Sequence, residues 1–205
     1  MTNSAKSNGY VIYSGPSRID GEPIVAIALG FKASSTNRKT GAMIQTYILR
    51  ADISPIDAVK TGADVSICGN CAARGILHNG KDRTCYVNLG QGPRAVFDAF
   101  TRGLYPRAED SRELGRNRLI RIGTYGDPYA VPVEVWDRLL ANATGYTGYT
   151  HQWREDNALS RHCMASVDSE REAIEARVAG WRTFRVAMPG HVARMPKEAI
   201  CPASA

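Results

Sequence analysis

The chain lacks a long apolar run. Its longest runs, such as residues 24–29, fall far short of the roughly 20 apolar residues that a membrane-spanning helix needs. Residues 1–9 also lack the apolar stretch of a signal peptide. These two absences argue against a membrane protein and against export. We therefore expect a protein of the cytoplasm, where thiols are kept reduced.

Histidine is scarce, with four residues among 205. The four are His78, His151, His162 and His191, and no two of them form a His-x-His pair. DNA-nicking replication proteins commonly use such a pair on one strand to hold their metal. Although the chain is basic and rich in tyrosine, its histidine pattern argues against this class.

The chain also lacks the even number of cysteines that a complete set of disulfides needs, since it has five. An odd count argues against a complete disulfide framework and favours metal or redox chemistry in a reduced compartment. The sequence has no internal repeat and no low-complexity segment. Its content of 43% hydrophobic and 22% charged residues is that of a folded chain, and its length suits one domain over residues 1–205.

Three of the cysteines fall within eighteen residues, in a glycine-dotted loop over residues 64–86. Cys68-Gly-Asn-Cys71 is followed, after thirteen intervening residues, by Cys85. Two cysteines at this short spacing can reach one metal ion from a single turn, and thiolates are strong ligands for soft metals. The loop therefore predicts a metal or cluster site, against the plainer interpretation of three unliganded thiols with Cys85 in the core.

The fourth ligand is open at this stage. His78, Cys163, Cys201 or a non-protein group could complete the set. Cys163, inside an expected strand, also fits the interpretation of a small buried hydrophobic residue. Structural zinc needs four ligands, so three nearby cysteines favour a 4Fe-4S iron–sulfur cluster with one open iron over zinc.

Short apolar runs alternate with helical patterns along most of the chain. This alternation predicts an α/β fold with a largely parallel sheet, resembling a partial (βα) barrel preceded by a pair of N-terminal strands. Ser54 and Pro55 predict a helix start, as N-cap and first helical residue. We expect a disordered tail over residues 1–8, N-terminal strands within 9–50, strand–helix units over 93–188 and an irregular tail over 189–205. Strands are expected at residues 10–13, 23–29, 43–49, 119–122, 146–153, 162–167 and 181–188, and helices from 54, at 93–103, at 133–143 and at 170–179.

Polar residues follow three of the expected parallel strands. They are Gly126-Asp127-Pro128, His151 and Asp168-Ser169. Parallel α/β folds bind ligands at the carboxyl ends of their strands, so these residues are candidates for a common rim. The alternative interpretations are a plain strand-to-helix turn for Asp127 and a packed, hydrogen-bonded histidine for His151.

The net charge of +6 favours polyanions without demonstrating that the chain binds nucleic acid. Residues 31–42 form a basic, hydroxyl-rich loop that could hold a phosphate or be a solvated turn. Gly90-Gln-Gly92-Pro-Arg-Ala95 matches the dinucleotide fingerprint but lacks its acidic partner at the end of the next strand, and a helix entry explains it as well. The residues of a possible nucleic-acid face are Lys32, Arg38, Lys39, Arg112, Arg116 and Arg118.

The order of a three-cysteine loop, a helix and a strand ending in Gly126-Asp127-Pro128 resembles the radical S-adenosylmethionine enzymes. In that family a three-cysteine loop carries a 4Fe-4S cluster, and a Gly-Gly-Glu-Pro-like motif ends the second barrel strand. The present spacing is C-x2-C-x13-C where the family has C-x3-C-x2-C, and Asp127 stands in place of glutamate.

This resemblance implies how an enzyme would be built. The open iron would bind the amino acid end of S-adenosylmethionine, and Gly126 and Asp127 would contact the cofactor's amino group. His151, Asp168 and Arg185 would lie near a small-molecule or macromolecular substrate, and the reaction would begin with reductive cleavage of the cofactor to a radical.

Cys68-Gly-Asn-Cys, Thr84-Cys-Tyr-Val-Asn, Thr147-Gly-Tyr-Thr-His and Gly180-Trp-Arg-Thr-Phe also resemble a group of bacteriophage and prophage proteins. In that group a Cys-Pro-Ala-Ser segment tends to lead into a further cysteine-rich stretch, which implies a second metal site at Cys201. The sequence thus predicts an iron–sulfur protein with radical S-adenosylmethionine chemistry as its candidate reaction. The alternative is a non-catalytic zinc module that binds nucleic acid through its arginine-rich face.

Overall fold

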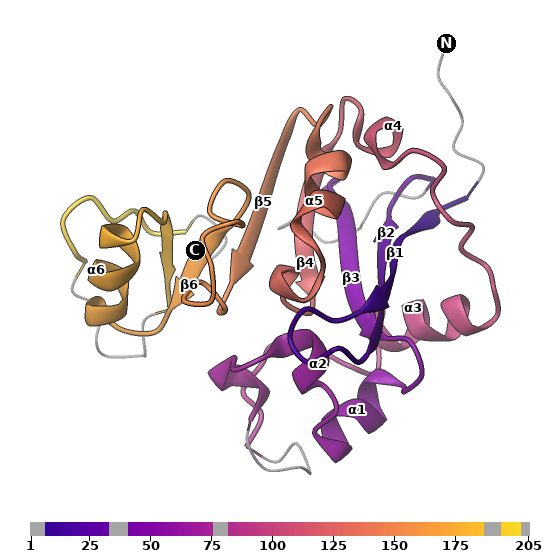
Figure 1. Ribbon diagram of the computed structural model, residues 1–205, viewed down its shortest axis with the longest axis horizontal. Helices are drawn as coiled ribbons and strands as arrows, with labels where there is room; N and C mark the ends of the chain where they lie inside the picture. Colours follow the sequence, from indigo (N-terminus) through magenta and orange to yellow (C-terminus); the bar gives the residue numbers. More distant parts are fainter. Residues whose placement is uncertain (1–6, 33–40, 76–81, 187–193, 202–205) are drawn as a thin grey trace.

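A single seven-stranded sheet in the order β1 to β7 organises the chain (Figure 1). The computed structural model describes residues 7–32, 41–75, 82–186 and 194–201. Arg38, Lys39, His78, His191 and the expectations for residues 1–6 and 187–193 lie outside these residues. The strands are β1 (Gly9–Pro16), β2 (Pro23–Leu29), β3 (Ile44–Arg50), β4 (Leu119–Tyr125), β5 (Gly145–Thr150), β6 (Met164–Val167) and β7 (Thr183–Arg185).

The first three strands are antiparallel, and every pair from β3 to β7 is parallel. The expectation of an α/β fold with a mostly parallel sheet and N-terminal strands is therefore confirmed. The sheet is open, with β1 and β7 at its two edges, and it does not close into a barrel.

The helices are α1 (Pro55–Thr61), α2 (Val65–Cys68), α3 (Gly92–Thr101), α4 (Ser111–Gly115), α5 (Val133–Leu140) and α6 (Glu170–Val178). The Ser54 hydroxyl accepts a hydrogen bond from the Asp57 amide, and Pro55 is the first helical residue, as predicted. The short helices α2 and α4 were not predicted from the sequence. In Figure 1, α1 and α2 lie at the carboxyl end of the parallel strands and α4 at the opposite end.

The core is centred on β2 and β3. Residues 24–28 of β2 are fully buried, as are Ile44, Ile48 and Leu49 of β3. Such a continuous apolar run is typical of a strand covered on both faces. Trp136 of α5 is also fully buried, and its indole N–H donates to the Pro128 carbonyl at 3.0 Å.

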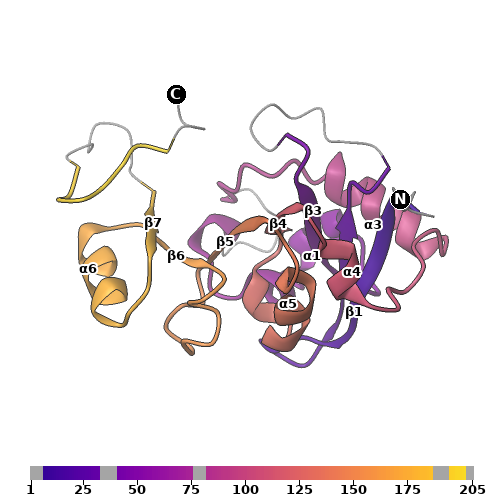
Figure 2. The ribbon, with the colours of Figure 1, turned by 90° about the horizontal axis from the view of Figure 1, so that it is seen from above.

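The strands β6 and β7 and helix α6 form a lobe at one side of the molecule, which we call the C-terminal lobe (Figures 1 and 2). Strand β5 connects it to the rest of the sheet. Residues 145–148 of β5 pair with β4, and residues 149–150 pair with β6. No helix among the described residues is long and apolar enough to cross a membrane.

Candidate metal site

The three cysteines of the loop lie close together at the carboxyl end of the parallel strands. Cys68 ends α2, and the Cys71 amide donates to the Cys68 carbonyl at 3.3 Å to close the turn between them. Cys85 returns to this turn because its amide donates to the Ala73 carbonyl at 2.9 Å. Burial raises the pKa of the Cys68 thiol, and Asp64, Cys71 and Cys85 raise it further by their charge. The long gap before Cys85 therefore still brings it beside the pair.

His151 lies beside the cysteine turn. It follows the last residue of β5, and its Nε2 lies 3.7 Å from the Sγ of Cys71. Eighty residues separate the two side chains in the sequence. The parallel order of β4 and β5 brings them together, because the Cys71 turn packs at the carboxyl ends of these strands. His151 therefore joins the cysteines, a placement that neither spacing nor composition could reveal.

Asp127 holds His151 in position. Its buried carboxylate accepts hydrogen bonds from the amides of Tyr129 at 2.9 Å and His151 at 2.8 Å and from the Thr150 hydroxyl at 2.7 Å. Burial raises the pKa of Asp127, and these hydrogen bonds oppose that rise. All three hydrogen bonds to this carboxylate come from the chain itself. The carboxylate therefore caps the end of the strand and fixes the backbone of His151.

The cysteine turn is also tied directly to the end of β5 and the residues after β4. The Asp127 amide donates to the Ile67 carbonyl at 2.6 Å, and the Gln152 side chain donates to the Cys68 carbonyl at 3.2 Å. Gly69 has a φ of 58°, and a Cβ there would lie 2.5 Å from the Gln152 carboxamide. Only glycine allows this close approach at a left-handed backbone position.

Tyr125 adds a polar group without a partner. Its hydroxyl is buried and has no hydrogen-bond partner among the described residues. Burial raises the pKa of Tyr125, and the charges of Cys68, Asp64 and Cys85 raise it further. The phenol is therefore close to the thiols. A buried hydroxyl without an acceptor is rare and costs free energy. A group that accepts a hydrogen bond would therefore fit on this side of the site.

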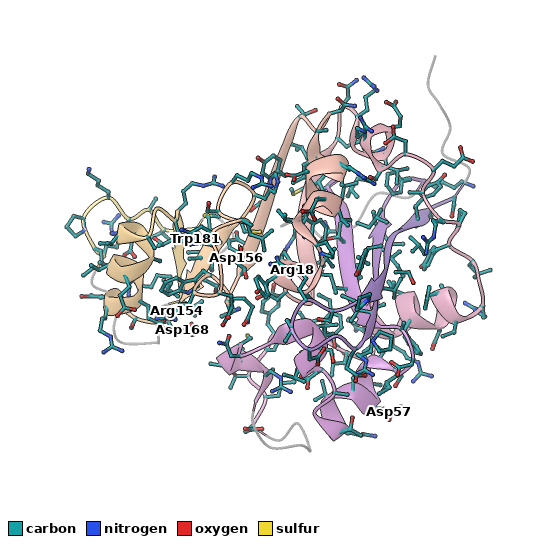
Figure 3. All side chains as sticks on the ribbon, viewed as in Figure 1. Arg18, Asp57, Arg154, Asp156, Asp168 and Trp181 are labelled. Atoms are coloured by element: carbon teal, nitrogen blue, oxygen red, sulfur yellow. The ribbon has the colours of Figure 1, made fainter. Side chains whose placement is uncertain are left out.

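Two other predicted residues lie in the C-terminal lobe, away from the cysteines. Asp168 is exposed at the end of β6, and its amide donates to the Glu172 carboxylate at 2.8 Å (Figure 3). Arg185 forms an ion pair with Glu198 at 2.7 Å. No contact among the described residues joins either one to Cys68, Cys71 or Cys85. The rim of strand ends therefore brings Asp127 and His151 together but not Asp168 and Arg185.

Gly126 has a packing role in the structure. Its φ is 81°, and a Cβ would lie 2.7 Å from the Cβ of Ile48 on β3. The glycine thus lets the chain turn tightly against the neighbouring strand before Asp127. Its place in the cofactor motif of the resemblance stays a prediction.

The other two cysteines are separate from the turn. Cys163 is fully buried just before β6, and its Sγ lies 3.1 Å from where a Cβ of Gly148 would be. Burial raises the pKa of this thiol, which fits the interpretation of a small apolar core residue. Cys201 is partly buried at the end of the last described segment. Within the described ranges, no three His, Cys, Asp or Glu side chains are arranged to hold a metal ion as they stand.

The predicted nucleic-acid residues are in part neutralised by neighbours. Arg112 lies 3.4 Å from the Asp110 carboxylate, and Arg116 pairs with Glu113. Arg118 donates to the Gly30 carbonyl at 3.0 Å and lies over the ring of Phe31. Lys32 is exposed.

Tyr125 and Gln152 were given no role by the sequence reasoning, although both adjoin residues that it selected. Tyr125 directly precedes Gly126, and Gln152 directly follows His151. Comparison with protein-family models, with curated proteins and with solved structures yields no match to this chain. The case for a function therefore depends on the geometry of the cysteine turn.

Proposed function

We propose that the chain binds one zinc ion through Cys68, Cys71, Cys85 and His151. The distance between Cys71 Sγ and His151 Nε2, 3.7 Å, carries this proposal. Zinc bonds of about 2.3 Å to sulfur and about 2.0–2.1 Å to nitrogen at a tetrahedral angle place two such ligands about 3.6 Å apart. The spacing of this pair therefore suits two ligands of one ion.

The chemistry of the donor set fits zinc as well. Three cysteines and one histidine are a common structural zinc set, and all four positions are then filled by the protein. Without an open position the ion has no place for a reactive water, so its role is structural. The ion would tie the turn after α2 and the segment of Cys85 to the end of β5.

The surroundings support the same assignment. The Asp127 carboxylate holds the backbone of His151, and the Tyr125 hydroxyl, which has no hydrogen-bond partner in the described ranges, lies near Cys68 and Cys85. Groups that orient ligands and donate hydrogen bonds to thiolates commonly surround metal centres. A thiolate at Cys68 or Cys85 would provide the acceptor that the Tyr125 hydroxyl lacks.

An iron–sulfur cluster on the three thiolates is the second candidate. The observation that favours it is that Cys71 and Cys85 both lie close enough to Cys68 to raise the pKa of its thiol by their charge. Three cysteines suffice for a 4Fe-4S cluster with one open iron. In that case His151 would lie beside the cluster, and S-adenosylmethionine would be the candidate for the open position.

Metal analysis of protein purified without oxygen tests the proposal. We expect a colourless protein with about one zinc per chain, and loss of most of the zinc in Cys71→Ser and in His151→Ala. Cys201→Ser is the matched control, because it removes a partly buried thiol outside the turn, and it should keep its zinc.

The other possible results of the metal analysis would replace zinc by the cluster, contradict the ligand set or refute both candidates. A brown protein with several irons per chain, retained in His151→Ala, would replace zinc by the cluster. Zinc that stays bound in both Cys71→Ser and His151→Ala would contradict this ligand set. Absence of both metals from the wild-type chain after growth with zinc and iron would refute both candidates.

A further inference from the structure

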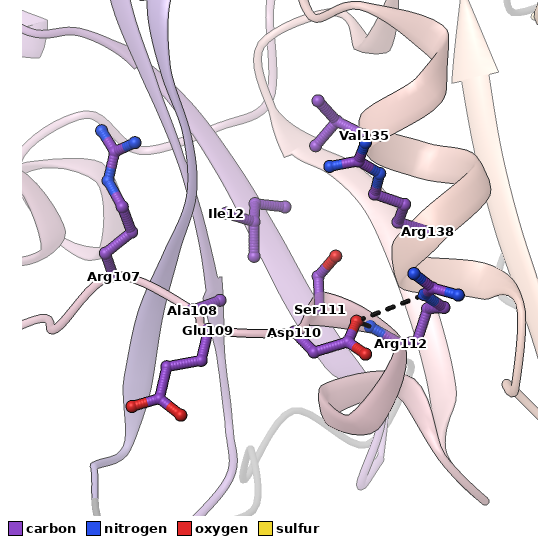
Figure 4. Close-up of a pocket in the computed structure, with 9 residues that line it drawn as sticks. All are labelled: Ile12, Arg107, Ala108, Glu109, Asp110, Ser111, Arg112, Val135 and Arg138. Carbon is purple, nitrogen blue, oxygen red and sulfur yellow. Dashed lines mark hydrogen bonds and ion pairs between the residues drawn. The ribbon is translucent and has the colours of Figure 1, made fainter.

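A cavity of about 360 Å³ lies between β1, the segment before α4, and α5 (Figure 4). Helix α4, which begins at this cavity, is at the opposite end of the sheet from the cysteine turn (Figure 1). The volume falls at the lower end of the range of about 300–1,000 Å³ that is typical of small-molecule sites. The cavity is therefore separate from the candidate metal site and large enough for a small ligand.

Arginine side chains line this cavity from two sides. Arg107 and Arg112 come from the segment before α4 and from α4 itself, and Arg138 comes from α5 (Figure 4). Within the described part of the chain, no carboxylate pairs with Arg107 or Arg138. Ten other arginines of the described residues do form ion pairs: Arg18, Arg50, Arg74, Arg94, Arg112, Arg116, Arg154, Arg161, Arg171 and Arg185.

Two carboxylates also line the cavity, Glu109 and Asp110, and among the described residues Glu109 forms no ion pair. Asp110 accepts from the Arg112 amide at 3.0 Å as the N-cap of α4, and its carboxylate also lies 3.4 Å from the Arg112 guanidinium. Asp137, next to Arg138 on α5, is bound to Arg161 and His162. Three arginines and two carboxylates thus line the cavity, so its lining carries a net charge of +1.

The backbone at the cavity is anchored. The Val11 amide donates to the Pro106 carbonyl, and the Ala108 amide donates to the Val11 carbonyl, both at 2.9 Å. These two bonds fix Arg107 against β1, and α5 fixes Arg138. Between them lie the partly buried aliphatic side chains of Ile12 and Val135. The cavity thus combines arginine side chains on an anchored backbone with an apolar surface.

We infer that this cavity binds a small phosphate-bearing molecule, of the size of a mononucleotide or smaller. Arg107 or Arg138, which lie on either side of Ile12 (Figure 4), would bind the phosphate, since arginine donates paired hydrogen bonds to phosphate oxygens. Ile12 and Val135 would contact the uncharged part of the ligand. A polynucleotide is disfavoured because the cavity is small, and Arg116 at the end of α4 is already paired with Glu113.

Calorimetric titration of the metal-loaded protein with AMP and with inorganic phosphate tests this inference. We expect saturable binding of AMP that weakens as the salt concentration rises. In Arg107→Gln/Arg138→Gln the affinity should fall at least about tenfold, since two charge-assisted hydrogen-bonding groups are removed. Arg171→Gln is the matched control, because Arg171 is an exposed arginine on α6, and its affinity should be unchanged.

Three results would overturn the inference. They are no measurable binding of either probe to the wild-type protein, equal affinity in the double variant, and an equal loss in Arg171→Gln. A single-stranded oligonucleotide that binds much more tightly than AMP, with a contribution from Arg171, would replace the small ligand by nucleic acid. Thermal unfolding of the double variant should match the wild type, because both side chains are exposed and form no ion pair with the described residues.

Discussion

The two halves of the sheet differ in the length of their strands, in the size of the side chains that they bury and in their polar contacts. Strands β1 to β4 have seven or eight residues each, whereas β6 has four and β7 has three. The first half buries large aliphatic side chains such as Ile27 and Ile48. The C-terminal lobe buries fewer and mostly smaller ones, such as Ala165 and Ala173, with Trp181 as its large buried residue. Because hydrophobic stabilisation scales with buried apolar area, the first half contributes most of the folding free energy.

Polar contacts compensate in the C-terminal lobe. Arg154 pairs with Glu172 and Glu175, and the Trp181 indole donates to the Asn157 side chain at 2.8 Å (Figure 3). Arg18 and Asp156, paired at 2.6 Å, connect the lobe to the first half of the sheet. The candidate metal site lies where the halves meet, since His151 follows the strand that both share. A metal there would strengthen the weaker junction.

The largest effect is expected from Trp136→Ala in the well-packed half. The variant removes a fully buried aromatic side chain and should lower the free energy of unfolding by about 3–5 kcal/mol. Urea denaturation measures it. Trp136→Phe should cost less, since the ring volume is largely kept and mainly the bond to Pro128 is lost. A cost below about 1 kcal/mol for Trp136→Ala would contradict the assignment of the main core to this half.

Asp127→Ala should have the next largest effect, at the junction. It leaves the Thr150 hydroxyl and the amides of Tyr129 and His151 without their acceptor, which should cost about 2–4 kcal/mol. Because the His151 backbone loses its anchor, metal affinity should fall about 10–100-fold. Competition with a chelator measures the affinity. Asp156→Ala, which removes a partly exposed ion pair, should leave it unchanged; an equal loss there would contradict the role of Asp127.

Trp181→Phe tests the polar support of the C-terminal lobe. It removes the hydrogen bond to Asn157 while keeping an aromatic ring, and should cost about 1 kcal/mol. Amide hydrogen exchange should accelerate in β6, β7 and α6 and stay unchanged in β2 and β3. Equal acceleration in β2 and β3 would show that the two halves unfold as one unit.

The smallest effect concerns pH. The Arg185 guanidinium lowers the pKa of Glu198 from 4.5 to about 2. The stabilisation of the fold by this ion pair is therefore present above pH 4.5 and is lost as the pH falls toward 2. Glu198→Gln should lower the melting temperature slightly at neutral pH and match the wild type at the acid end. A difference in melting temperature between Glu198→Gln and the wild type that grows as the pH falls would contradict this prediction.

Much of the fold could be predicted because its signals are local. The apolar run of β2, the Ser54 cap and the helix pattern at residues 170–179 each occur within a short stretch, and the structure confirms them. The helices α2 and α4 were missed because they have four and five residues, too few for a periodic pattern. The end expected for β5, at residue 153, was wrong because the His151 amide donates to the Asp127 carboxylate and the Gln152 amide donates to the Thr150 hydroxyl instead of to a neighbouring strand.

The sequence by itself determined the alternation of strands and helices and the grouping of Cys68, Cys71 and Cys85, because hydrophobic periodicity and ligand spacing depend on neighbours in the chain. Only the tertiary structure decided that His151 meets Cys71, that the Asp127 carboxylate is occupied by the chain itself, and that Arg107 and Arg138 share a cavity. These contacts join residues from different strands and helices. Their partners are set by sheet order and packing, which no local pattern records.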